Sequence, residues 1–272
     1  LHIWHQLTKT KNKEKTYNKL IGNIEELTKY DNKTKQEYEL IVPLKFWFCN
    51  NTGSSLPLVA LNNSVKIKVD LKELEEVCYY EPSSKFKKKP HLECSMIAEY
   101  IFIGCEERNT IVNAKNEYLV NGVLYNGDVE INKSCVSKII KTSLKNQVTE
   151  LFWMLQNLSD KNYDDYTFKL GTTKINPIDK TKILFSGRDR QNFLDKIYYN
   201  FIQPYEKHNS TPSLGINIYS FSINPEISYQ PSGYANMFRA DTELEIMLND
   251  NVVKKIIEEN LRLRFPIYGR TL

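Results

Sequence analysis

The sequence predicts an all-β protein made of sheet-on-sheet sandwiches, with helical and loop excursions between the strands. Aromatic residues make up 12% of the 272 residues, with 17 Tyr and 12 Phe, and this composition favours β-structure. Several short segments alternate apolar and polar residues with a period of two, and long connections separate them. They do not alternate regularly with helices, which argues against a doubly wound α/β fold. The pattern resets near residue 115, and this predicts two sandwich units in series.

The first unit begins with a polar, lysine-rich stretch over residues 9–39 that has partly helical spacing. Residues 40–48 then place five apolar side chains on one face in strict alternation, which predicts a strand. Residues 65–71 alternate in the same way, with Lys and Asp on the outer face, and predict a half-buried strand. Residues 97–103 are strand-like and largely apolar on both faces.

The second unit has clearer strand signals. Residues 147–155 and 181–190 predict strands, and the latter leads into a tight glycine turn with an Arg–Asp pair. Residues 193–201 have helical spacing, and Pro204 predicts the end of that helix. Residues 215–226 and 242–250 alternate as strands, and residues 252–257 predict a helix that precedes a final alternating segment.

Composition and motifs give no support to a catalytic, cofactor-binding or metal site. The 37 Lys and Arg against 33 Asp and Glu give a net charge of +4, too mild to indicate a nucleic-acid-binding protein. The five cysteines are scattered and form no CxxC pair, and no apolar run approaches the length of a membrane span. The carboxylate pairs are adjacent in sequence, so on a strand they point to opposite faces. His208 stands alone in a polar loop, where a surface position is the simplest interpretation.

Five collinear stretches resemble one protein family. "ELIVPLKFWFCNNTGSSLPLVALNNSVKIKV" over 39–69 is similar to a strand–turn–strand of the double jelly-roll major capsid proteins of nucleocytoplasmic large DNA viruses. The start "LHIWHQLT", the stretch 97–120 and "ILFSGRDRQNF" with its continuation to residue 226 agree with the same family in the same order. "YQPSGYANMFRAD" resembles the family signature "QPSGTCNFSRID", although Tyr234, Ala235 and Met237 depart from it.

This resemblance implies a tandem of two jelly rolls and a structural, non-enzymatic function without cofactors. Residues 1–117 would be the C-terminal part of a first, incomplete jelly roll whose beginning lies upstream of Leu1, and residues 118–272 the second jelly roll. Members assemble as homotrimeric, pseudo-hexagonal capsomers that tile an icosahedral virus shell, usually over an internal membrane. The expected partners are therefore the chain itself, neighbouring capsomers, minor capsid or cement proteins and the inner viral membrane, without direct nucleic-acid binding. The expected location is the virion capsid, with assembly in a viral factory of the host cytoplasm.

The matching stretches also supply the candidate structural residues. Within the loop 224–241, Pro225 and Pro231 interrupt a strand ladder, and Gly233 can take a positive φ. Arg239 offers a planar five-donor fork that we expect to hold this corner, with Asp241 as its candidate partner. The full set of motif residues is Phe46, Trp47, Phe48, Pro57, Gly187, Asp189, Arg190, Pro225, Gln230, Pro231, Ser232, Gly233, Arg239 and Asp241.

Two other functions stay open at this point. One is a scaffold or minor capsid protein of the same fold. The other is a jelly-roll module that binds a glycan or receptor, for which Tyr163, Asp164, Asp165 and Tyr166 are the candidate residues. An enzyme on a cupin-like barrel is the weakest alternative, because the 4 His are scattered and form no ligand cluster.

Overall fold

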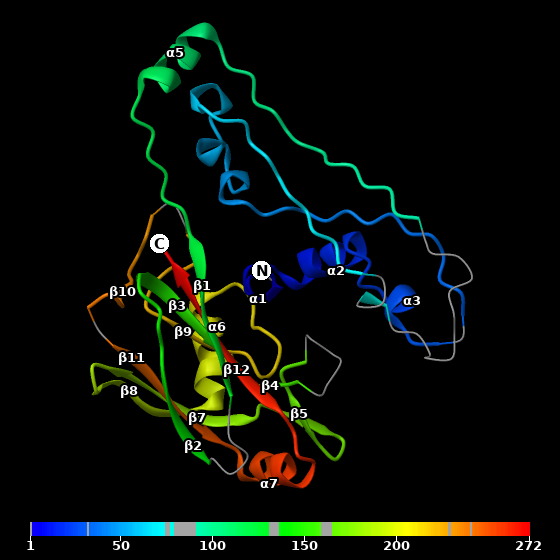
Figure 1. Ribbon diagram of the computed structural model, residues 1–272, viewed down its shortest axis with the longest axis vertical. Coiled ribbons are helices and arrows are strands. Elements are labelled where there is room, and N and C mark those ends of the chain that lie inside the picture. The colour runs from blue at the N-terminus through cyan, green and yellow to red at the C-terminus, as the bar shows by residue number, and fades with distance from the viewer. Residues whose placement is uncertain are drawn as a thin grey trace. The chain divides into compact units, whose positions relative to one another are not determined.

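The computed structural model describes residues 2–31, 33–73, 77–78, 91–130, 136–158, 165–227, 230–239 and 241–272. The chain divides into two compact units. Unit 1 comprises Leu1–Asn18 and Leu119–Leu272, and unit 2 comprises Lys19–Tyr118. All the strands that the described residues form lie in unit 1 (Figure 1).

Unit 1 is a sandwich of two antiparallel sheets. The first sheet has the order β1-β12-β3-β10, with β4 paired to β12 and β9 paired to β3, and the second has the order β2-β11-β7-β8. The strands of these sheets are β1 (Gly122–Glu130), β2 (Ser137–Lys141), β3 (Gln147–Trp153), β4 (Gln156–Asn157), β7 (Ile178–Phe185), β8 (Arg188–Asp195), β9 (Asn217–Ser220), β10 (Ala235–Asn236), β11 (Thr242–Leu248) and β12 (Leu263–Thr271). Because the first strand pairs with the last and the second with the last but one, the topology is that of a jelly roll.

One apolar core joins the two sheets. Trp153 on β3 and Phe265 on β12 pack in the same cluster as Ile183 on β7 and Leu244 on β11, and all four are fully buried. Strand β11 shows why the sequence folds in this way, since its buried and half-buried positions alternate over the whole strand. Each sheet therefore presents one apolar face, and burying the two faces against each other closes the sandwich.

Short helices flank the strands of unit 1. Helix α1 (His2–Thr8) and helix α2 (Lys11–Leu20) come first in the chain, and α7 (Asp250–Glu258) precedes β12. The side chain of Asn249 caps α7 by accepting a hydrogen bond from the backbone N–H of Asn251, and Val252, Val253 and Ile256 form its buried face. The hairpin β5 (Phe168–Leu170) and β6 (Thr173–Ile175) completes the unit.

The helix predicted over residues 193–201 is placed differently in the structure. Strand β8 continues through Phe193 to Asp195, and the helical part consists of a π-helix at Tyr198–Ile202 followed by α6 at Gln203–Lys207. Pro204 does not end the helix, because it lies in the first turn of α6, where a missing N–H costs little.

Unit 2 consists of extended chain and short helical turns. Its helical elements are α3 (Glu25–Thr28), η1 (Trp47–Cys49), η2 (Thr52–Ser54), η3 (Leu58–Ala60) and α5 (Cys105–Asn113). With these helices the chain is about 25% helix, so the all-β prediction is too strong, and the fold is a mainly β sandwich.

The three strands predicted in unit 2 do not form within the described residues. Residues 40–46, 65–71 and 97–103 have no regular secondary structure, residues 47 and 48 begin η1, and none of these segments forms a strand ladder with another described segment. Their apolar side chains are accordingly exposed, with 59% exposure for Val42 and 65% for Val69. Alternation defines the apolar face of a strand, but a strand also needs a neighbour to accept its backbone hydrogen bonds.

In the part of the chain that the structure describes, no helix is both long and apolar enough to span a membrane.

Candidate functional site: a buried ionic cluster and the loop beside it

Glu150 is a fully buried carboxylate in the middle of an apolar strand. It lies on β3, where the flanking residues from Val148 to Trp153 are buried as well. The strand register places Arg270 of β12 directly opposite on one side and Ser220 of β9 on the other. Nη1 of Arg270 lies 3.3 Å from Oε2 of Glu150, so the two strands are joined by a buried ion pair as well as by backbone bonds.

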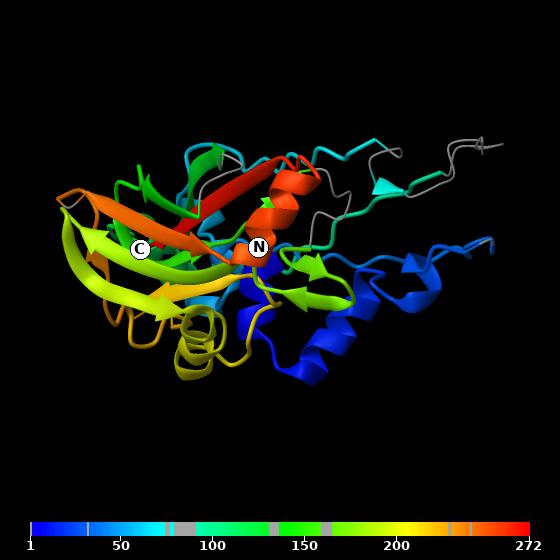
Figure 2. The ribbon, with the colours of Figure 1, turned by 90° about the horizontal axis from the view of Figure 1, so that it is seen from below.

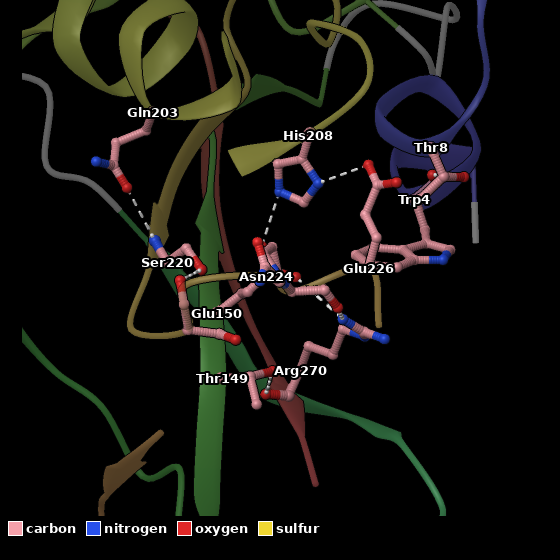
Figure 3. A network of polar contacts seen from close by, with 12 residues as sticks. Trp4, Thr8, Thr149, Glu150, Gln203, His208, Ser220, Asn224, Glu226 and Arg270 are labelled. Atoms are coloured by element: carbon pink, nitrogen blue, oxygen red, sulfur yellow. Dashed lines mark hydrogen bonds and ion pairs between the residues drawn. The ribbon is translucent and has the colours of Figure 1, made fainter. Parts of the chain in front are cut away.

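His208 adds a second cation to this carboxylate. Its Nε2 lies 2.8 Å from Oε1 of Glu150, and its Nδ1 lies 3.3 Å from Oε1 of Glu226 (Figure 3). Glu226 also accepts hydrogen bonds from the backbone N–H of Asn209, at 2.9 Å, and from the Asn209 side chain. We call Glu150, His208, Glu226 and Arg270 the ionic cluster.

The ionic cluster fastens segments that are far apart in the sequence. Arg270 donates a hydrogen bond to the carbonyl of Pro225, and its guanidinium lies 3.7 Å from the ring centroid of Trp4 on α1. The Trp4 ring meets the His208 ring edge-on, at a centroid distance of 5.8 Å. The backbone N–H of Ser210 donates to the carbonyl of Leu7 at 2.9 Å. Helix α1, the loop after α6 and the loop that contains Pro225 are therefore held against β3 and β12.

The charges of the ionic cluster balance when His208 is protonated. Burial disfavours the charged imidazole, but the hydrogen bonds and negative charges of Glu150 and Glu226 outweigh burial and raise the pKa of His208 above its ordinary value. Burial lowers the pKa of Arg270, with Glu150 opposing that shift, and a guanidinium remains charged at any ordinary pH. Two cations thus face two carboxylates in a site where neither Glu150 nor His208 has any exposed side chain.

This arrangement suits a structural clamp. Its central carboxylate and imidazole are closed to solvent, so a substrate cannot reach them without unfolding. Within the described residues, no three His, Cys, Asp or Glu side chains are grouped in a way that could hold a metal ion. The chemistry that remains is electrostatic: a set of mutually satisfied charges that fixes one arrangement of the surrounding chain.

Stability is expected to fall at alkaline pH because of His208. The pKa of this residue is raised in the folded state, so its contribution is complete below the unfolded pKa, near 6.5, and is lost as the pH rises through the folded value. Thermal unfolding measured from pH 6 to pH 9 should show a decline in Tm for the natural protein. A His208→Gln variant should start lower and change less over the same range, and parallel curves would contradict this assignment.

The predicted loop 224–241 lies next to the ionic cluster and is closed by serine hydroxyls. Oγ of Ser232 lies 2.7 Å from Oγ of Ser222 and accepts a hydrogen bond from the backbone N–H of Asn224, also at 2.7 Å. Gly233 has a φ of +146°, and an added Cβ would lie 2.7 Å from the carbonyl oxygen of Phe221. Pro225 is buried, whereas Gln230 and Pro231 are exposed. The structure thus holds Ser232 and Gly233 against the chain at residues 221–224, directly before Pro225.

The predicted glycine turn is confirmed as the β7–β8 hairpin. Ser186 and Gly187 have φ values of +49° and +76°, as a two-residue hairpin turn requires. The backbone N–H of Ser186 donates to the carbonyl of Asp241 at 2.7 Å, so this turn meets the end of the 224–241 loop. Asp189 pairs with Lys182 at 2.8 Å, and the expected Arg–Asp pair with Arg190 does not form.

Arg239 is exposed, and between it and Asp241 the structure records no ion pair. Since both residues are described but Ala240 between them is not, the role of Arg239 at this corner stays a prediction.

The remaining motif residues belong to unit 2. Phe46 and Phe48 stack at a centroid distance of 5.0 Å, and Trp47 meets Phe48 edge-on at 5.5 Å and Tyr118 at 5.2 Å. Trp47 and Pro57 line a cavity of about 410 Å³ together with Leu56, Ala60, Leu61, Val112, Ala114, Asn116 and Tyr118. The lining residues come from η1, η3 and the chain around the end of α5, and the aromatic contacts of Trp47 lie beside them.

The surface position expected for His208 is wrong, because its side chain is fully buried between two carboxylates. The signal for this site was Glu150 itself, a charge inside an apolar strand that must find a cation to be buried.

Of the candidate glycan residues, Tyr163 and Asp164 lie outside the described residues. Asp165 is engaged within the fold by Lys174 at 2.7 Å and by Thr167.

Two family models match the chain. Residues 107–263 match the model of the large eukaryotic DNA virus major capsid protein, and residues 1–103 match the model of the major capsid protein N-terminus. The major capsid protein of Phaeocystis pouchetii virus is 25% identical, over 97% of this chain and 73% of that protein. The major capsid protein of Pyramimonas orientalis virus is 29% identical, over 93% of this chain and 66% of that protein.

Solved structures show the same fold. The crystal structure of PBCV-1 VP54, fitted into a cryo-EM reconstruction of the virophage Sputnik, superposes with a TM-score of 0.68 and 20% identity. That match covers 99% of this chain and 74% of the other. The quasi-atomic model of the PBCV-1 virus capsid gives a TM-score of 0.62 over 99% of this chain and 81% of the other.

Proposed function

Because the chain belongs to the family of major capsid proteins of large eukaryotic DNA viruses, we propose that it forms homotrimeric, pseudo-hexagonal capsomers that tile an icosahedral shell. The family is structural and not enzymatic, and its place is the virion capsid. The observation that supports the proposal best is the jelly-roll sandwich of unit 1, in which two antiparallel sheets enclose one apolar core. Such a sandwich is a rigid block that can be repeated in a lattice.

The two-domain organisation belongs to the same proposal. We infer that residues 118–272 are the second jelly roll and that residues 1–117 contain the C-terminal part of the first. The exposed alternating segments of unit 2 support this inference, because each has the pattern of a sandwich strand but pairs with no strand among the described residues. A trimer in which each subunit has two jelly rolls contains six similar domains. Six similar domains around one axis account for a pseudo-hexagonal outline.

The proposed partners follow from that role. Each capsomer would contact neighbouring capsomers and minor capsid or cement proteins, with an inner viral membrane beneath the shell, after assembly in a viral factory of the host cytoplasm. The mild net charge of +4 supports contacts with protein over direct contacts with packaged nucleic acid.

The oligomeric state of the purified protein tests the proposal. Sedimentation equilibrium should give three times the mass of one chain, and negative-stain images should show particles with a six-cornered outline. A monomer at every concentration would contradict the proposal. Trimers that form only flat honeycomb sheets on immature membranes would indicate a scaffold protein of the same fold.

A further inference from the structure

The helical segment between β8 and β9 has its polar and apolar faces reversed. It contains the π-helix Tyr198–Ile202 and α6, and Figure 2 shows it in yellow, outside the strands of unit 1. Asn200 and Gln203 point inward and are buried, although they are amides. Ile197, Phe201, Ile202 and Tyr205 are exposed, although they are apolar or aromatic, and we call these four residues the outer stripe.

Hydrogen bonds to the backbone fix this reversed orientation. The side-chain N–H of Asn200 donates to the carbonyl of Ile216 at 2.7 Å, and the Gln203 carbonyl accepts from the backbone N–H of Ser220 at 3.2 Å. Tyr199 lies beside them and donates its hydroxyl proton to the carbonyl of Thr181 at 3.1 Å. Turning the helix to bury the outer stripe would break all three bonds and leave buried polar groups without partners, which is costly.

The outer stripe is large enough to be the centre of a protein interface. The exposed fractions are 55% for Ile197, 45% for Phe201, 41% for Ile202 and 81% for Tyr205. With about 200 Å² for a large aromatic side chain, the stripe offers roughly 400 Å² of mostly apolar surface. That equals the largest patch on a typical monomer and is about half of what one partner contributes to a standard interface.

We propose that the outer stripe is a contact between copies of this chain, seated on a second copy within the proposed trimer. This inference rests on the proposed function, since self-assembly is what a capsid subunit does. The size of the stripe agrees with that occupant, because roughly 400 Å² is the apolar core of a standard interface and leaves the rim to neighbouring polar residues. Aromatic anchors such as Phe201 and Tyr205 are the residue types that dominate binding at such centres.

The test compares association of the natural chain with that of a Phe201→Ser/Tyr205→Ser double variant. Sedimentation over a range of concentrations should show association weakened by about thirtyfold or more, the effect expected of lost hot-spot residues. Because the outer stripe is exposed within one chain, the Tm of the variant under dissociating dilution should equal that of the natural chain. Ile257→Ser is the matched control, since Ile257 is 54% exposed on another helix, α7, and its loss should not change association.

A photo-crosslinking residue at position 205 identifies the occupant. The expected product has twice the mass of the chain, and a product crosslinked only within one chain overturns the inference. If the natural protein forms trimers and the double variant forms them equally well, the outer stripe is not the contact, but the proposed function stands. If the natural protein never associates, the proposed function and this inference both fail.

Discussion

Replacing Glu150 by Gln is expected to lower the free energy of unfolding by about 3–5 kcal/mol, the usual cost of removing one partner from a buried ion pair. The substitution keeps the shape of the side chain and removes only its charge. Glu226 would then be the one carboxylate left in the ionic cluster; it is more exposed than Glu150 and pairs with His208 but not with Arg270. At least one cation would be left buried without compensation, and this explains why the expected loss is large.

Chemical denaturation of both proteins at pH 7 measures this difference. Glu243→Gln is the matched control, because Glu243 also lies on a central strand and forms a salt bridge, with Lys141 at 3.5 Å. The Lys141 side chain of that pair is 83% exposed, so the pair is screened by water and its loss should cost at most about 1 kcal/mol. Similar losses for the two variants would show that the ionic cluster adds no more to stability than a surface pair.

The parts of the fold that were predictable from sequence are those in which local pattern and tertiary partner agree. Strand β11 is one case, since its alternation matches its burial in the core, and β2 and β7 pair with its backbone on both sides. Helix α7 is another, because an Asn cap and three apolar residues at helical spacing settle its start and its buried face. The glycine turn at Ser186 and Gly187 was also predictable, since few residue types tolerate two successive positive φ values.

Predictions from the sequence fail where the residues that a segment contacts in the fold lie far away in the chain. The alternation of residues 40–48 and 65–71 specifies a face for burial, yet neither segment forms a strand ladder with another described segment. The helix before β9 was misplaced because its inward face carries Asn200 and Gln203, whose partners are backbone groups that no pattern reveals. The ionic cluster was missed for a related reason, since its members are up to 120 residues apart in the chain and meet only through strand pairing.

Gly215→Ala is expected to destabilise unit 1 by about 4 kcal/mol, at the upper end of what single substitutions cost. Gly215 begins the approach to β9 with a φ of +97°, and an added Cβ would lie 2.1 Å from the carbonyl oxygen of Tyr166. That contact is with backbone, so it cannot be relieved by turning a side chain. Gly187→Ala is the control, because Gly187 has a φ of +76° but no atom within 4 Å of an added Cβ. It should cost only about 1 kcal/mol, the penalty of the backbone conformation alone.

The difference between these two variants separates crowding from backbone conformation, and it also bears on the outer stripe. The residue after Gly215 is Ile216, whose carbonyl accepts the hydrogen bond from Asn200 that holds the helix with its apolar side outward. Moving the backbone at residue 215 should therefore loosen the helix as well as the strand. We expect Gly215→Ala to weaken association between copies under conditions in which unit 1 is still folded, whereas Gly187→Ala should leave association unchanged. Equal association in both variants would mean that the orientation of the helix does not depend on this bond.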